Sequence, residues 1–134
     1  MDNLDNIDFM KLSKSKDLTY EQFIMYPTAN WDFYQLSKHN FLTLNWLLQH
    51  PLAKWDFYQL SKNDFITLDW LNAFPKADWD FHELSKHKEI NSKWIVTLPN
   101  ADWDLSEVFK HEHFELNWLD NLPHIKNRLL EELL

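Results

Sequence analysis

The residues of this 134-residue chain best suited to metal chemistry lie near its C-terminus. His111 and His113 flank Glu112, and Glu115 follows two residues later. Imidazole nitrogens and carboxylate oxygens are ligands of catalytic zinc, so residues 111–115 could form the site of a metal-dependent hydrolase. A helix-ending role explains His111 without a metal, because its position recurs along the chain as His39, Asn63 and His87. We therefore predict no metal and no other cofactor.

Five aspartates recur 24 residues apart, and such a row of carboxylates could bind cations or act in catalysis: Asp8, Asp32, Asp56, Asp80 and Asp104. The last four are each followed three residues later by Gln or Glu, which is the spacing of a capping box at the start of a helix. In that motif the aspartate side chain accepts a hydrogen bond from a backbone N–H. We therefore assign Asp32, Asp56, Asp80 and Asp104 to helix caps.

The tryptophans and prolines define a repeat. All eight tryptophans fall into two series with a step of 24 residues: Trp31, Trp55, Trp79 and Trp103, then Trp46, Trp70, Trp94 and Trp118. The five prolines follow the same step, at Pro27, Pro51, Pro75, Pro99 and Pro123. A fixed period of about 20 to 50 residues is typical of a stacked repeat array. We predict one repeat domain over 1–134, with a degenerate unit at 3–26, repeats at 27–50, 51–74, 75–98 and 99–122, and a capping helix at 123–134.

Each repeat contains the signals of two short helices. The first Trp precedes the cap, and Leu36, Leu60, Leu84 or Val108 follows the cap by four residues, which is the spacing of a hydrophobic staple. We expect this helix to run about two turns and to end near His39 or its equivalents in a left-handed conformation. The second helix should begin at Thr43 or Thr67 and end before the next proline.

Helices this short are unstable alone, so the repeats must bury their aromatic side chains against one another. The eight tryptophans could in principle form a platform for stacking bases or sugars. Their spacing as staple and helix-core residues favours a structural role, and we predict that they form the repeat core. The predicted fold is all-α, an α-solenoid of tandem 24-residue two-helix repeats with degenerate capping units.

The repeat pattern, P-x-A-x-W-D-F-x-x-L-S-K-[HN]-x-x-[LI]-T-x-x-W-[LI], resembles the short Trp-rich repeats of giant DNA viruses such as mimiviruses. The resemblance spans residues 7–122. The chain departs from the pattern at 106–110, which reads SEVFK, and in the first unit, which lacks Trp. In addition, Asn91 and Glu115 replace Thr. The resemblance implies a helical repeat protein, and a viral origin would imply a host factor as partner and a location in the host cytoplasm.

Composition narrows the functional classes. The chain has no Cys, which excludes disulfides and thiolate sites, and no Gly, which excludes glycine-rich phosphate loops. Net charge is −8, and repeat 99–122 contributes −5 from six acidic residues and one Lys. This charge disfavours direct nucleic-acid binding and favours a basic protein or peptide as partner. No apolar run could span a membrane, and the acidic N-terminus is unlike a secretory signal, so we expect a cytoplasmic or nuclear protein.

One surface is typical of an interface. Ala29, Phe33 and Leu36 share the face of the first helix that should be buried. The opposite face then carries an aromatic residue or His next to a Lys in three repeats: Tyr34 with Lys38, Tyr58 with Lys62, and His82 with Lys86. Tyrosine is enriched in protein interfaces, although a simple solvated face is the alternative.

The function predicted from these features is a noncatalytic scaffold for protein–protein interaction, and we predict that the chain is not an enzyme. Solenoids present extended surfaces to peptides or proteins. We expect a monomer. Two alternatives remain: an assembly component that stacks end to end, and a metal-dependent enzyme near residues 111–115.

Overall fold

A computed structural model describes residues 6–120 and 122–133 of the chain. Residues 3–5 of the degenerate first unit, residue 121 of the last repeat and residue 134 of the capping helix lie outside the described residues. The described part is all-helical and contains no strand, as predicted. The chain divides into two compact units, unit 1 over Met1–Asn63 and unit 2 over Asp64–Leu134.

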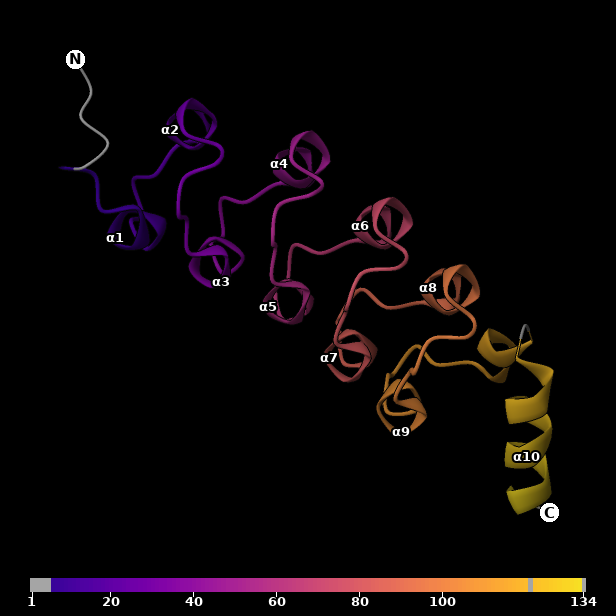
Figure 1. The fold of residues 1–134 in the computed structure, drawn as a ribbon. Coiled ribbons are helices and arrows are strands. Elements are labelled where there is room, and N and C mark those ends of the chain that lie inside the picture. The colour runs from indigo at the N-terminus through magenta and orange to yellow at the C-terminus, as the bar shows by residue number, and fades with distance from the viewer. Residues whose placement is uncertain (1–5, 121, 134) are drawn as a thin grey trace. The chain divides into compact units, whose positions relative to one another are not determined.

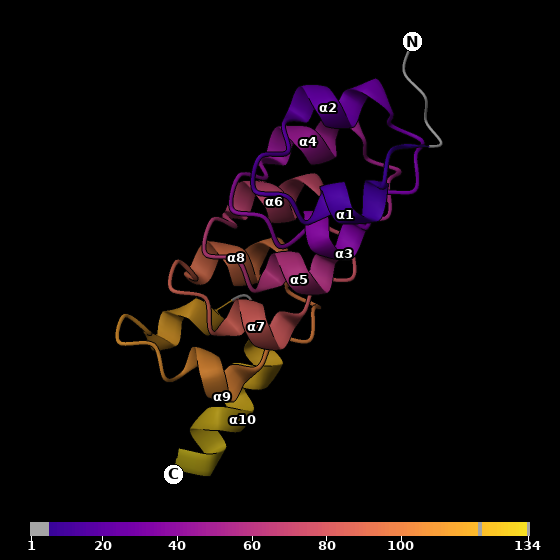
Figure 2. The ribbon, with the colours of Figure 1, turned by 90° about the vertical axis from the view of Figure 1, so that its left-hand side faces the viewer.

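Unit 1 contains five short helices arranged in two rows. The helices are α1 (Phe9–Ser13), α2 (Tyr20–Met25), α3 (Phe33–Leu36), α4 (Leu44–Gln49) and α5 (Phe57–Ser61). Figure 1 shows α1, α3 and α5 following one another in one row, with α2 and α4 in the other, and Figure 2 shows the same succession from the side. Within unit 1, the first helix of each repeat therefore stacks on the first helix of the next.

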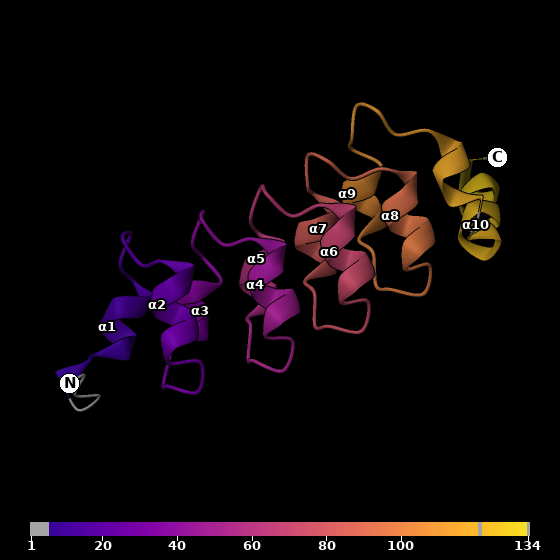
Figure 3. The ribbon, with the colours of Figure 1, turned by 90° about the horizontal axis from the view of Figure 1, so that it is seen from above.

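Unit 2 repeats this arrangement and adds a longer helix at its end. Its helices are α6 (Leu68–Ala73), α7 (Phe81–Ser85), α8 (Ser92–Thr97), α9 (Leu105–Val108), the 3₁₀ helix η2 (Leu116–Leu119) and α10 (Pro123–Leu133). Helices α7 and α9 pack together, and α6, α8 and η2 form the second row. The last helix, α10, packs on η2 and runs crosswise to the other helices of this unit (Figures 1 and 3). Both units have the two-row stacking that an α-solenoid requires.

The second helix of the last repeat differs from its equivalents. The stretch Leu116–Leu119 forms a 3₁₀ helix, whereas α4, α6 and α8 are α-helices. Glu115 stands at its N-cap and makes no side-chain cap bond, as is also the case for Thr43 and Thr67 at the starts of α4 and α6. Pro123 then opens α10, where its missing N–H costs nothing because the first N–H groups of a helix have no partner inside it.

The first helices are shorter than predicted and end differently. They run for only four or five residues and end at Leu36, Ser61, Ser85 or their equivalents, two or three residues before the expected position. No non-glycine residue of the described chain has a positive φ, so the predicted left-handed ending at His39 and its equivalents is wrong. The side chains of His39, Asn63 and His111 instead bond to a carbonyl at the C-terminal end of the first helix in the preceding repeat.

The core consists of tryptophan and aliphatic side chains. All eight tryptophans are only 2–7 % exposed, and Leu36, Leu60, Leu84 and Val108 are completely buried. In unit 1, the ring of Phe23 lies 5.3–5.8 Å, between centroids, from those of Trp31, Trp46 and Trp55. Phe23 thus supplies the aromatic bulk in a degenerate repeat that has no Trp of its own.

A contact between consecutive repeats recurs in the core. A phenylalanine at the start of a first helix packs edge-on against the first Trp of the next repeat, with centroids 5.0–5.1 Å apart. The pairs are Phe9–Trp31, Phe33–Trp55 and Phe81–Trp103. Edge-to-face packing at this distance is favourable for aromatic rings. Within each unit, a repeat therefore contributes to the core of the repeat that follows it.

The two faces of a first helix predict very different costs of truncation. Trp55 is 5 % exposed and contacts both Phe23 and Phe33, so Trp55→Ala should destabilise the fold by about 3–5 kcal/mol. Tyr58, three residues later, is 57 % exposed, and Tyr58→Ala should cost about 0.5 kcal/mol or less. Urea unfolding followed by circular dichroism measures both. Similar losses would show that the two faces have been assigned wrongly.

Candidate functional site

The tryptophans of the first series form hydrogen bonds to the backbone. In the first series, each indole N–H donates to the backbone carbonyl five residues earlier, at the C-cap of the preceding second helix, over 2.8–2.9 Å. The acceptors are the carbonyls of Tyr26, His50, Phe74 and Leu98. Since all eight rings are also buried, they present no open face on which a base or sugar could stack.

The repeated aspartates cap helices. Asp8, Asp32, Asp56, Asp80 and Asp104 each have extended backbone at the N-cap and accept a hydrogen bond from the backbone N–H three residues later. The reciprocal half of the predicted capping box is not formed at Asp32, Asp56 or Asp104. There the cap N–H donates to a serine hydroxyl of the previous repeat, over 2.9 Å in each case.

These serines are the structural residues that the sequence analysis missed. Ser13, Ser37 and Ser85 are completely buried, and their hydroxyls accept from the N–H of Asp32, Asp56 and Asp104 respectively. The hydroxyls of Ser13 and Ser85 also donate to the carbonyl four residues earlier in their own helices. The Leu-Ser dipeptide recurs every 24 residues at 12–13, 36–37, 60–61 and 84–85, which is the signal that could have indicated a shared role.

His39, Asn63 and His111 make a second bond between repeats. The side chain of each reaches the backbone carbonyl of the serine 26 residues earlier, at Ser13, Ser37 and Ser85, over 2.5–2.8 Å. That carbonyl lies at the C-terminal end of a helix, where it has no partner within the helix. We call the serine hydroxyl bond and this side-chain bond together the repeat clasp.

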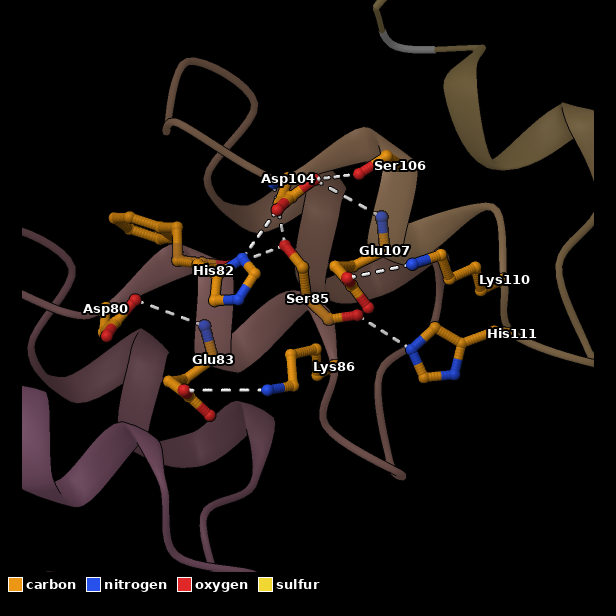
Figure 4. Close-up of polar contacts among 11 residues, drawn as sticks. Asp80, His82, Glu83, Ser85, Lys86, Asp104, Ser106, Glu107, Lys110 and His111 are labelled. Atoms are coloured by element: carbon orange, nitrogen blue, oxygen red, sulfur yellow. Dashed lines mark hydrogen bonds and ion pairs between the residues drawn. The ribbon is translucent and has the colours of Figure 1, made fainter.

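The predicted metal residues at 111–115 do not converge. Nε2 of His111 is engaged with the carbonyl of Ser85, as Figure 4 shows. His113 and Glu112 are more than four-fifths exposed, with His113 Nε2 3.8 Å from the Glu112 carboxylate. In the part of the chain that the structure describes, the three potential metal ligands that come within 4.8 Å of one another are His82, Asp104 and Glu107.

This polar cluster joins α7 to the start of α9 (Figure 4). His82 Nδ1 lies 2.6 Å from Asp104 Oδ2, and Ser106 Oγ donates to Asp104 Oδ1 over 2.6 Å. The N–H of Glu107 also donates to Oδ1, and the Glu107 carboxylate accepts from Lys110 over 3.1 Å. The cluster is open to solvent, since the His82 side chain is 53 % exposed.

The hydrogen bonds to Asp104 determine its ionisation. The hydroxyl of Ser106, and after it the His82 ring, lower the pKa of the Asp104 carboxyl from an ordinary 3.8 to about 2. Asp104 is therefore a carboxylate at neutral pH, and His82 Nδ1 must carry the proton between them. One imidazole and two carboxylates are donors suited to zinc. In the protein, however, each of the three already has a partner, so the arrangement is explained as a helix cap whose carboxylate is also hydrogen-bonded to the preceding repeat.

The predicted Tyr–Lys surface divides between the two units. Tyr34, Lys38, Tyr58 and Lys62 are exposed in unit 1, with the Lys38 ammonium 5.0 Å from the centre of the Tyr34 ring. In unit 2, His82 is bound to Asp104, and Lys86 lies 3.7 Å from Glu83. Among the described residues, neither Lys38 nor Lys62 pairs with a carboxylate. Tyr34, Lys38, Tyr58 and Lys62 therefore make up the surface that stays open, which we call the Tyr–Lys surface.

Comparison with known proteins finds no family model, curated sequence or solved structure that matches this chain. None of the helices in the described part has the length and apolar character that a membrane span needs.

The clasp predicts that Asn can replace His111 and that Ala cannot. His111→Ala leaves the Ser85 carbonyl without its partner and should cost about 1–3 kcal/mol of unfolding free energy. His111→Asn should stay within about 0.5 kcal/mol of the wild type, because Asn63 makes the same bond in another repeat. Urea unfolding distinguishes the two. Equal destabilisation by Ala and Asn would rule out the clasp role.

The lowered pKa of Asp104 predicts a specific pH dependence. The folded pKa of about 2 lies below the unfolded value of about 4, so the contribution of Asp104 to stability is complete above pH 4 and is lost as pH falls towards 2. Carboxyl NMR should find the Asp104 midpoint near 2. Ser106→Ala should raise that midpoint, whereas Ser92→Ala, outside the cluster, should not. An Asp104 midpoint near 3.8 in the wild type would contradict the network.

Proposed function

We propose that the protein is a noncatalytic scaffold that binds another protein or peptide. The observation that carries the proposal is the Tyr–Lys surface of unit 1, where two consecutive repeats present the same aromatic and cationic side chains to solvent. The resemblance to giant-virus repeats extends the proposal to a viral protein with a host factor as its partner.

Tyr34 and Tyr58 are not part of the core. In the repeat that contains Tyr34, Trp31 and Trp46 are buried in the core, at 4 % and 5 % exposed, while Tyr34 is 45 % exposed. Tyr58 repeats the pattern at 57 % exposed. A rigid aromatic side chain loses little conformational entropy on binding, which is why tyrosine is frequent at interfaces.

The potentially reactive groups support a noncatalytic role. The capping carboxylates accept backbone N–H groups, and His39 and His111 bond to backbone carbonyls. Catalysis by such groups requires them to converge on a substrate with a free proton or lone pair. Here they serve instead to hold short helices together.

Affinity capture with matched variants tests the proposal. The test variant carries Tyr34→Ala, Tyr58→Ala and Lys62→Ala. The control carries Asn45→Ala, Gln49→Ala and Lys54→Ala, three exposed residues of the same unit. Both variants should keep the circular dichroism spectrum and unfolding midpoint of the wild type.

The wild type and the control should retain the same specific protein from the native or host lysate, and the test variant should lose it. If no protein is retained specifically, or if the two variants retain the same proteins, the proposed function fails.

A further inference from the structure

We propose that the partner binds as an extended acidic peptide along the row formed by α1, α3 and α5 of unit 1. This inference rests on the proposed function and specifies the chemistry of the partner. Three observations carry it: a row of lysines without carboxylate partners, a parallel row of exposed apolar side chains, and the spacing of the repeats.

The lysines occupy equivalent positions in the three repeats. Lys14, Lys38 and Lys62 each follow the Leu-Ser dipeptide and stand at or just after the C-terminal end of a first helix. All three are exposed. Because the serine hydroxyl bonds hold α3 to α1 and α5 to α3 in the same way, the three ammonium groups form a row with one member per repeat. We call it the lysine row.

In unit 2 the lysines at the same position are neutralised by a carboxylate of their own helix. There, Lys86 and Lys110 each have a glutamate three residues earlier, with Nζ 3.7 Å from Glu83 and 3.1 Å from Glu107. The corresponding residues in unit 1 are Lys11, Gln35 and Gln59, none of which is acidic. Among the described residues of unit 1, the lysine row has no carboxylate partner.

The excess negative charge, on which the expectation of a basic partner rested, lies in unit 2 and not in the unit that carries the lysine row. Unit 1 has seven acidic residues against six lysines, a net charge of −1, and unit 2 has fourteen acidic against seven basic residues, a net charge of −7. The carboxylates of Asp8, Asp32 and Asp56 belong to the opposite, N-terminal ends of the same helices, where they accept backbone N–H groups. The lysine row is therefore complementary in charge to an acidic segment, whereas it would repel a basic segment.

An apolar row accompanies the charges. Four residues before each lysine stands a large exposed side chain, Met10, Tyr34 or Tyr58, at 45 %, 45 % and 57 % exposed. Residues four apart share one side of a helix, and the 5.0 Å contact of Lys38 with Tyr34 shows this directly. A bound peptide can therefore place an apolar contact beside each ion pair.

The repeat spacing gives the register of the peptide. Packed helices lie about 8–10 Å apart, and an extended chain in the polyproline II conformation advances about 3.1 Å per residue with three residues per turn, so that every third side chain lies on one face. One repeat therefore corresponds to about three peptide residues. A ligand with an acidic residue at every third position should match the lysine row.

Fluorescence anisotropy with the full chain tests the inference. The probe is a labelled peptide of about twelve residues with Glu at every third position and Ala or Ser elsewhere. Its comparison peptides carry Gln or Lys at those positions, or the same glutamates in one block. The test variant is Lys14→Gln, Lys38→Gln and Lys62→Gln. The control, Lys86→Gln with Lys110→Gln, removes lysines from equivalent positions of unit 2.

The wild type should bind the spaced Glu peptide about tenfold more tightly than the Gln peptide, and that preference should weaken as salt is raised. It should also bind the spaced peptide more tightly than the block peptide. The test variant should lose the preference for Glu, and the control should keep it.

The inference is overturned if no acidic peptide binds, if the Lys peptide is preferred, if both lysine variants lose binding equally, or if a single-stranded oligonucleotide binds through the same lysines as tightly. The proposed function survives these outcomes whenever the lysate partner is still lost from the Tyr34, Tyr58 and Lys62 variant, so the two failures can be distinguished.

Discussion

The structure depends on satisfying the backbone at the ends of very short helices. A helix of four to six residues leaves nearly all of its N–H and C=O groups without partners inside the helix. Such a helix is not stable alone in water. The same set of hydrogen bonds to these helix ends recurs every 24 residues. Within a repeat, the Asp carboxylate accepts from a backbone N–H and the Trp indole donates to a backbone carbonyl. The repeat clasp provides partners from the neighbouring repeat for a further N–H and a further carbonyl.

The local half of this solution could be predicted from the sequence. Asp32 and its cap partner are three residues apart, so the spacing alone identifies the bond. The clasp bonds join residues 19 and 26 apart, and the pairing of His82 with Asp104 joins residues 22 apart. A pattern read one repeat at a time assigns such residues to their own helix. This is why His39 was expected to end its helix through a left-handed backbone, whereas its side chain bonds to the previous repeat.

Function is best sought in the positions that the repeat leaves free to vary. The Trp, Asp and Ser side chains of the repeat already bond to the backbone or pack in the core. The residue three before the lysine changes from Lys or Gln in unit 1 to Glu in unit 2, and the residue four before it changes from Met or Tyr to His or Ser. These changes close the surface of unit 2 with ion pairs and leave the Tyr–Lys surface of unit 1 open. The pairs of Lys86 with Glu83 and of Lys110 with Glu107 lie within one repeat and could be read from their spacing. The partner of His82 could not, because Asp104 belongs to the next repeat.

Hydrogen exchange at the Asp56 amide tests the clasp most directly. That N–H donates to the hydroxyl of Ser37 in the preceding repeat and has no partner within its own helix. If the clasp holds the repeats together, the Asp56 amide should exchange as slowly as the buried helix amides of unit 1, and Ser37→Ala should accelerate it. Exchange of the wild-type Asp56 amide at the rate of an exposed loop amide such as that of Asn40, while the helix amides stay protected, would contradict the account.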